Sequence, residues 1–219
     1  MDFFYSMVSF FQKGGLFMYP ILLVFAVGLA IAVERWIQLY RIRSANQGMW
    51  KTLQPVLLKG EFDKARQMVN KDKSTIAQML GMGLARQGAV RRRDDIEIAM
   101  EESMMEIIPQ LEKRTPYVAL LSNIATLLGL LGTIMGLIEA FTAVANANPA
   151  EKADLLSASI SVAMNTTAFG LMAAIPLLLF HAKLSSTTGQ IIDSLEMASV
   201  KALNTISNFA KRQIEASVS

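Results

Sequence analysis

Two threonines in long uncharged stretches, Thr133 and Thr167, have the chemistry to line a narrow polar path. Thr133 lies in Gly129-Leu-Leu-Gly-Thr-Ile-Met-Gly136, and Thr167 ends the polar run Asn165-Thr166-Thr167. A hydroxyl can relay hydrogen bonds along a path, or it can simply bond back to its own helix. Spacing alone leaves both interpretations open for Thr133. The three polar residues 165–167 surround more than half of a helix, so some of them must face protein or water.

Titratable side chains are missing from the middle of these stretches. Glu139 lies near the end of the stretch that contains Thr133, as a solvated interfacial carboxylate or, alternatively, a proton entrance. His181 follows the stretch that contains Thr167 and fits an interfacial anchor better than a relay. A proton path normally needs a titratable group near the bilayer centre. A proton-conducting role would therefore need a carboxylate from another chain.

The elements that must position these residues are membrane-spanning helices. Residues 16–33, 117–138 and 155–180 form uncharged runs of 18, 22 and 26 residues, and the chain is 53% hydrophobic with mean hydropathy +0.37. About 20 helical residues cross a hydrocarbon core. The first run has no basic lead-in and no small-residue cleavage site, so we expect it to be retained as an anchor. The sequence predicts an all-α polytopic membrane protein with three transmembrane helices.

Small and hydroxylated residues recur at steps of three and four in the second and third runs. They are Ser122, Thr126, Gly129, Thr133, Gly136 and Ala140 in one run, and Ser159, Ala163, Thr166, Gly170 and Ala173 in the other. Such stripes allow close helix packing, for which Gly129, Gly132, Gly136 and Gly170 are the candidate positions. We expect the two stripes to face a central axis or adjacent subunits, leaving the first helix toward lipid.

Basic residues predict the orientation. Those on one side of the three runs are Arg35, Arg41, Arg43, Lys113, Arg114 and Lys183. By the positive-inside rule, the N-terminus is periplasmic and the C-terminus cytoplasmic. The run Arg91-Arg92-Arg93 precedes acidic residues at once, which favours a solvated helix start or contact with anionic lipid over nucleic acid. Without cysteine, and with a single histidine, the chain offers no metal cluster, and we expect no cofactor.

The expected organisation has seven segments. They are an outer-surface segment (1–13), transmembrane helix 1 (14–40), a cytoplasmic helical region (41–116), transmembrane helix 2 (117–145), a periplasmic loop (146–154), transmembrane helix 3 (155–182) and a cytoplasmic helical tail (183–219). We expect short helices at 61–70 and 74–87, with Ser74 capping the second. Apolar periodicity predicts long cytoplasmic extensions of helices 2 and 3, with Pro109 and Pro116 kinking the former.

The two motifs resemble a known family. Residues 129–141 (GLLGTIMGLIEAF) and 165–176 (NTTAFGLMAAIP) are similar to the paired motifs of the MotA/TolQ/ExbB proton-channel family, in its ExbB and TolQ branch. The resemblance implies a homopentamer around a dimer of ExbD- or TolR-like single-span partners, which supply a membrane aspartate. It assigns the pore threonines to Thr133 and Thr167, and implies that proton flow energises a TonB- or TolA-like protein from the bacterial inner membrane.

One departure and several alternatives stay open. Many ExbB and TolQ relatives have a glutamate early in the third span, where this chain has Val162, with Ser161 and Thr166 as the nearby polar groups. The expected function is an ExbB-like stator subunit for TonB-dependent transport. Alternatives are a TolQ-like subunit for envelope integrity and a non-conducting oligomeric scaffold. A four-span MotA-type stator fits less well, and no nucleophile or acid–base pair suggests an enzyme.

Overall fold

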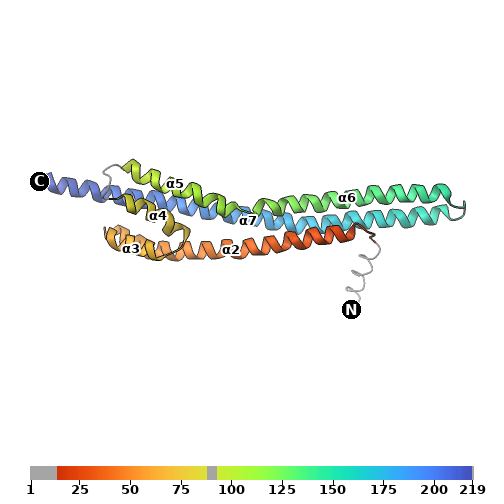
Figure 1. The fold of residues 1–219 in the computed structure, drawn as a ribbon, viewed down its shortest axis with the longest axis horizontal. Helices are drawn as coiled ribbons and strands as arrows, with labels where there is room; N and C mark the ends of the chain where they lie inside the picture. The colour runs from red at the N-terminus through yellow and green to blue at the C-terminus, as the bar shows by residue number, and fades with distance from the viewer. Residues whose placement is uncertain (1–13, 88–92, 219) are drawn as a thin grey trace, which may run out of the picture. The chain divides into compact units, whose positions relative to one another are not determined.

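The structure, a computed structural model, describes residues 14–87 and 93–218, with side chains as far as Ala210 except that of Asn146. Its regular elements are all helices: α2 (Met18–Leu58), α3 (Phe62–Lys71), α4 (Thr75–Arg86), α5 (Arg93–Glu112), α6 (Thr115–Asn146) and α7 (Lys152–Val218) (Figure 1). The predicted all-α fold is confirmed over this part of the chain. The surface segment expected at 1–13 lies outside the described residues.

Three helical stretches are long and apolar enough to cross a membrane by length and composition. They are Met18–Leu58, Arg93–Ala145 and Lys152–Ala210. Each overlaps one of the uncharged runs, so the prediction of three transmembrane helices is confirmed. The third is continuous with the tail, because α7 has 67 residues.

The junction between α5 and α6 differs from the expectation of a proline-kinked continuous helix. Pro109 lies inside α5, and Pro116 lies in the first turn of α6, where its missing N–H needs no partner. The helix instead breaks before Thr115, because Arg114 has a left-handed backbone with φ 65°. That conformation cannot continue a right-handed helix.

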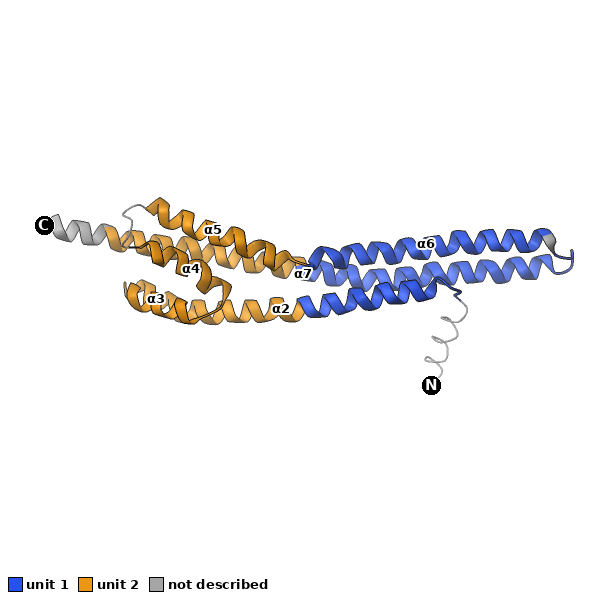
Figure 2. Ribbon diagram, in the orientation of Figure 1, with its two compact units in different colours: residues 1–35, 114–184 blue, residues 36–113, 185–219 orange. Residues whose placement is uncertain are grey.

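The chain divides into two compact units (Figure 2). Within the described part, unit 1 comprises residues 14–35 and 114–184, and unit 2 comprises residues 36–113 and 185–218. Helices α2 and α7 each contribute one segment to both units.

In unit 1, α6 and α7 pack antiparallel at very short range through their small-residue stripes. A Cβ placed on Gly170 would lie 2.9 Å from Gly129 Cα, and one placed on Gly136 would lie 3.0 Å from Ala163 Cβ. The first segment of α2 also packs closely against α7, since a Cβ on Gly28 would meet the Leu177 side chain at 2.8 Å. At these buried positions the stripes face each other and not an axis or a neighbouring subunit, because only small residues let two backbones approach so closely. For the exposed Thr126 and the half-buried Thr133, the expectation of a central axis or adjacent subunits stays a prediction.

Unit 2 has a core of large apolar side chains and polar contacts at its helix ends. Fully buried members come from α2, α4, α5 and α7: Leu53, Ile76, Met79, Leu80, Leu84, Met100, Leu111 and Leu195. The two predicted short helices are confirmed as α3 and α4, and Ser74 caps α4 by accepting a hydrogen bond from the Ala77 N–H at 3.4 Å. Gly60 turns the chain with φ 75° against the ring of Phe209.

Candidate functional site

The hydroxyl groups of Thr133 on α6 and Thr167 on α7 lie together in unit 1. They form a hydrogen bond with each other, and both side chains are half-buried. Thr133 Oγ1 lies 3.3 Å from the carbonyl oxygens of both Gly129 and Ala163, and Thr167 Oγ1 lies 3.0 Å from the Gly129 carbonyl oxygen. Back-bonding to its own helix is thus only one of the contacts that Thr133 makes. The cluster joins two helices.

Glycines create the room for this cluster. A Cβ on Gly129 would lie 3.2 Å from Gly170 Cα and 3.3 Å from the Thr166 carbonyl oxygen. The two backbones can therefore come close enough for a short threonine side chain to reach the carbonyl group of the opposite helix. The small-residue stripe and the hydroxyl pair are consequently parts of one arrangement.

Thr166 faces away from that pair. It is 2% exposed, and its hydroxyl donates to the carbonyl oxygens of Gly14, at 2.6 Å, and Val162, at 2.9 Å. Its methyl group occupies the space over Gly132, where a Cβ would come within 2.4 Å. Thr166 is placed for packing inside the chain. Asn165 precedes it on α7 and is half-buried.

Two positions near the pair matter for acid–base chemistry. Glu139 is exposed on α6, and six residues beyond Thr133 correspond to about 9 Å along a helix. Val162 is half-buried, with a side-chain methyl 3.2 Å from where a Cβ of Gly15 would lie. The Val162 side chain is therefore turned toward the chain segment before α2. In the described residues, no three His, Cys, Asp or Glu side chains are grouped to hold a metal ion.

Sequence reasoning missed one ion pair of unit 1. Arg114 donates to both carboxylate oxygens of Glu34, at 2.8 and 2.9 Å, and each side chain is about half exposed. The partners are 80 residues apart, so no local spacing could indicate the contact. The pair holds the left-handed Arg114 at the start of α6 against α2.

This arrangement defines the class of the protein. It is a polytopic helical membrane protein in which the second and third spans share a hydroxyl cluster. A sequence profile of the MotA/TolQ/ExbB proton channel family matches residues 71–197, which include both threonines. The chain therefore belongs to that family.

Relatives of the ExbB and TolQ kinds agree with this assignment. An ExbB homolog described as a biopolymer transport protein, from Methanothermobacter thermautotrophicus, is 25% identical over 90% of this chain and 69% of its own length. The Tol-Pal system protein TolQ of Haemophilus influenzae is 36% identical over 40% of this chain and 38% of its own length. The biopolymer transport protein exbB1 of Vibrio cholerae is 47% identical over 26% of this chain and 25% of its own length.

Proposed function

We propose that this protein is an ExbB-like stator subunit of an ion-driven motor in the bacterial inner membrane, energising TonB-dependent outer-membrane transport. It would act as a homo-oligomer, a pentamer by resemblance, with an ExbD-like single-span partner. The observation that carries the proposal is the Thr133–Thr167 cluster, which joins two membrane-length helices of a proton-channel family member.

The hydrogen-bond inventory of the cluster supports a role as an acceptor. Each hydroxyl has one proton to donate, and the carbonyl oxygens of Gly129 and Ala163, together with the partner hydroxyl, can take both protons within the chain. Lone pairs of the hydroxyl oxygens then remain. Lone pairs can accept a hydrogen bond from a protonated carboxyl group but offer none to a carboxylate. The cluster would therefore hold a membrane carboxylic acid in its proton-carrying form.

The carboxylic acid itself must come from outside this chain. The runs 117–138 and 155–180 contain no Asp, Glu, His, Lys or Arg. An ExbD- or TolR-like aspartate would supply the group, with the N-terminus of this chain periplasmic and its C-terminus cytoplasmic. Each elementary charge that crosses about 100 mV makes about 2.3 kcal/mol available for work on a TonB- or TolA-like protein. Thr133, Thr167 and Asn165 would border the path, and the exposed Glu139 would serve as its entrance.

A non-conducting oligomeric scaffold is the second candidate function. The observation in its favour is that Gly129, Gly170 and Thr166 make packing contacts within one chain. In that case the hydroxyl pair would only fasten α6 to α7. A TolQ-like role in envelope integrity shares the proposed mechanism and differs in the protein that is energised.

Valine substitutions separate conduction from packing. Thr133→Val and Thr167→Val keep side-chain volume but remove the acceptor oxygens, so proton-driven activity should fall about tenfold or more, as losing a hydrogen bond of about 1.4 kcal/mol implies. Thr126→Val is the matched control, because among the described residues the exposed Thr126 bonds only to the Ser122 carbonyl oxygen of its own helix, at 3.2 Å. Complex mass after solubilisation should be unchanged in all three variants. Loss of the oligomer in Thr133→Val and Thr167→Val would favour the scaffold. Full activity in both of these variants would contradict the hypothesis of a proton path at the threonine pair.

Reconstitution tests the external carboxyl group with the same assay. Vesicles that hold this chain alone should show no proton flux above empty vesicles, since a lumen without a titratable group presents a desolvation barrier. Adding a single-span partner with a membrane aspartate should produce flux, and changing that aspartate to asparagine should remove it. Glu139→Gln should slow the flux only partially. Flux through this chain alone that Glu139→Gln abolishes would contradict the mechanism.

A further inference from the structure

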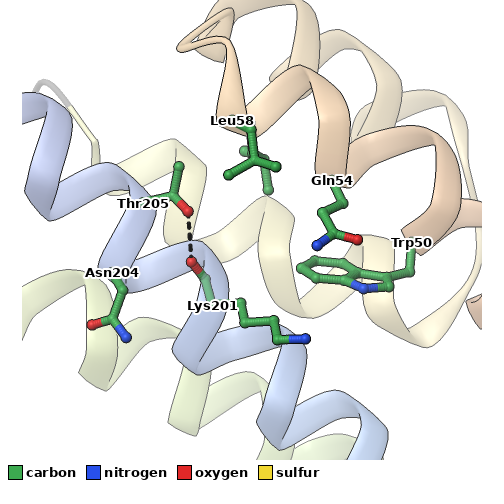
Figure 3. A pocket seen from close by; sticks show the side chains of 7 residues that line it. Trp50, Gln54, Leu58, Lys201, Asn204 and Thr205 are labelled. Atoms are coloured by element: carbon green, nitrogen blue, oxygen red, sulfur yellow. Dashed lines mark hydrogen bonds between the residues drawn. The ribbon is translucent and has the colours of Figure 1, made fainter.

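Unit 2 has a groove between the end of α2 and the tail part of α7. Its volume is about 240 Å³, and it is lined by Trp50, Gln54, Leu57, Leu58, Lys201, Asn204 and Thr205. Figure 3 shows the Trp50 indole and the Gln54 amide on one side and the α7 residues on the other. Small-molecule sites commonly enclose about 300–1,000 Å³. The size of the groove therefore suits side chains of a docking protein better than a whole ligand.

The groove combines an apolar floor with a positive rim. Leu57 is buried in the floor, whereas Leu58 is 60% exposed at the opening. The Thr205 hydroxyl already donates to the Lys201 carbonyl oxygen at 2.8 Å, and Asn204 Oδ1 accepts from Arg93 at 3.1 Å. Lys201 is exposed, and within the described residues no carboxylate pairs with its ammonium group. The exposed Lys51 adds a second positive charge beside Gln54, one helical turn away.

Helix α5 presents a surface of opposite character. Ile98 is 51% exposed and Met105 is 71% exposed, while the core contacts of this helix come from other positions such as Ile96 and Met100. Between the two exposed apolar residues lie the exposed carboxylates of Glu101 and Glu102. Spacings of three and four place these four residues on one side of the helix. Exposed apolar side chains bordered by charge are typical of an interaction surface.

We propose that the α5 surface of one copy of this chain, formed by Ile98, Glu101, Glu102 and Met105, docks into the Trp50–Lys201 groove of a neighbouring copy. Met105 and Ile98 would cover the leucines and the indole, and the glutamates would face Lys201 and Lys51. The inference rests on the proposed homo-oligomer and names the contact that would build it. Because the two surfaces are different, the contact is heterologous, and repeating it generates a ring when the rotation closes.

The charges favour a second copy of this chain as the occupant of the groove over a helix of another protein. The groove rim carries lysines, and the helix that exposes apolar residues next to carboxylates is found in the same chain, so each copy supplies both halves. Complementary charge steers association and fixes register more than it adds affinity. The apolar anchors in the groove would supply most of the binding energy.

Cysteine crosslinking tests this contact directly, because the chain has no cysteine of its own. Two differently tagged full-length copies, one with Met105→Cys and one with Gln54→Cys, would be co-expressed and treated in membranes with a short bismaleimide. We expect an adduct that carries both tags. Asp63→Cys replaces Met105→Cys as the matched control, since Asp63 on α3 is 94% exposed and lies outside the proposed surface. The control adduct should be at least several-fold weaker.

Charge reversal adds a rescue. Lys201→Glu in the Gln54→Cys copy should weaken the adduct several-fold, and Glu101→Lys in the Met105→Cys copy should restore it. An adduct no stronger than the Asp63→Cys control, in a complex whose mass by native mass spectrometry still shows an oligomer, overturns the contact and leaves the proposed function standing. Absence of any oligomer removes both. An adduct of Gln54→Cys with a different protein assigns the groove to that protein and also overturns the proposal.

Discussion

Unit 1 and unit 2 are both helical, but they hold their helices together in different ways. In unit 1, glycine and alanine bring the backbones of α6 and α7 within van der Waals distance, and hydroxyls such as Ser122, which donates to the Ala174 carbonyl oxygen at 2.8 Å, bridge them. In unit 2, leucine, isoleucine and methionine fill the space between helices. Lipid tails are as apolar as leucine, so burying large apolar side chains between helices stabilises their packing little in a membrane. Close van der Waals contact between the helices stabilises it instead.

The same contrast appears in the polar groups. Unit 2 uses them at helix ends: Asn46 contacts the start of α4, and the Arg66 guanidinium donates to the carbonyl oxygens of Leu84, at 3.0 and 3.2 Å, and Gln87, at 3.2 Å, at its end. Unit 1 uses hydroxyls in the middle of long helices, where the threonine pair lies. A helix end has unpaired backbone groups to satisfy, whereas a helix middle has none. Polar side chains in the middle of a span are therefore not needed to pair the backbone groups of a helix end, and they can bridge two helices or serve a function.

The largest expected effect comes from one added methyl group in unit 1. Gly170→Ala would place a Cβ 2.8 Å from the Ala125 carbonyl oxygen and 2.9 Å from Gly129 Cα, so α6 must move, at about 1–3 kcal/mol. Gly81→Ala in unit 2 is the matched control, because among the described residues its Cβ would meet only Val69, at an ordinary 3.6 Å. It should stabilise α4 by about 0.5–1 kcal/mol. Hydrogen exchange of α6 and α4 in detergent measures the effects of the two substitutions on helix stability. Equal effects in the two units would break the comparison.

A smaller effect is expected from the polar contact at the start of α4. Asn46 is 3% exposed, and its amide is hydrogen-bonded to Thr75 Oγ1 at 2.7 and 3.0 Å and to the Ile76 N–H at 3.2 Å. Asn46→Ala removes these hydrogen bonds and should destabilise unit 2 by about 0.5–1.5 kcal/mol, the typical net contribution of a hydrogen bond. Faster hydrogen exchange in the first turn of α4, with α6 unchanged, is the expected measurement. The exposed Asn70 provides the control, with an Asn70→Ala effect within about 0.5 kcal/mol.

The smallest effect is expected at the half-exposed pair of Glu34 and Arg114. Glu34→Gln should lower the free energy of unfolding by about 0.2–1 kcal/mol, and high salt should remove the difference. Arg114→Gly also loses the pair, but glycine relieves a left-handed backbone that costs other residues about 1–2 kcal/mol. Its net effect should be near zero or stabilising. In the Arg114→Gly background, Glu34→Gln should lose only the attraction between Glu34 and the adjacent Arg35, so its effect should be smaller. A full effect there would show that Glu34 does not act through Arg114.

The order of the elements was predictable because it depends on local patterns. Uncharged runs of membrane length indicate the spans, and apolar periodicity with Ser74 at a cap position indicates the short helices that became α3 and α4. The motif around Gly129 and Thr133 also singled out the two threonines that the structure brings together. Pattern alone could not tell which helix the small-residue stripes face, because a stripe fits a neighbour in the same chain as well as one in another.

The sequence by itself determined that this protein is helical, that three of its stretches suit a membrane, and that the middle of each lacks Asp, Glu, His, Lys and Arg, since these properties follow from composition and period. Only the tertiary structure decided that the stripes of α6 and α7 face each other, that Thr166 turns inward while Thr133 meets Thr167, and that Arg114 reaches Glu34 across 80 residues. Periodicity places a residue on a face of its own helix. What that face meets depends on how the helices pack.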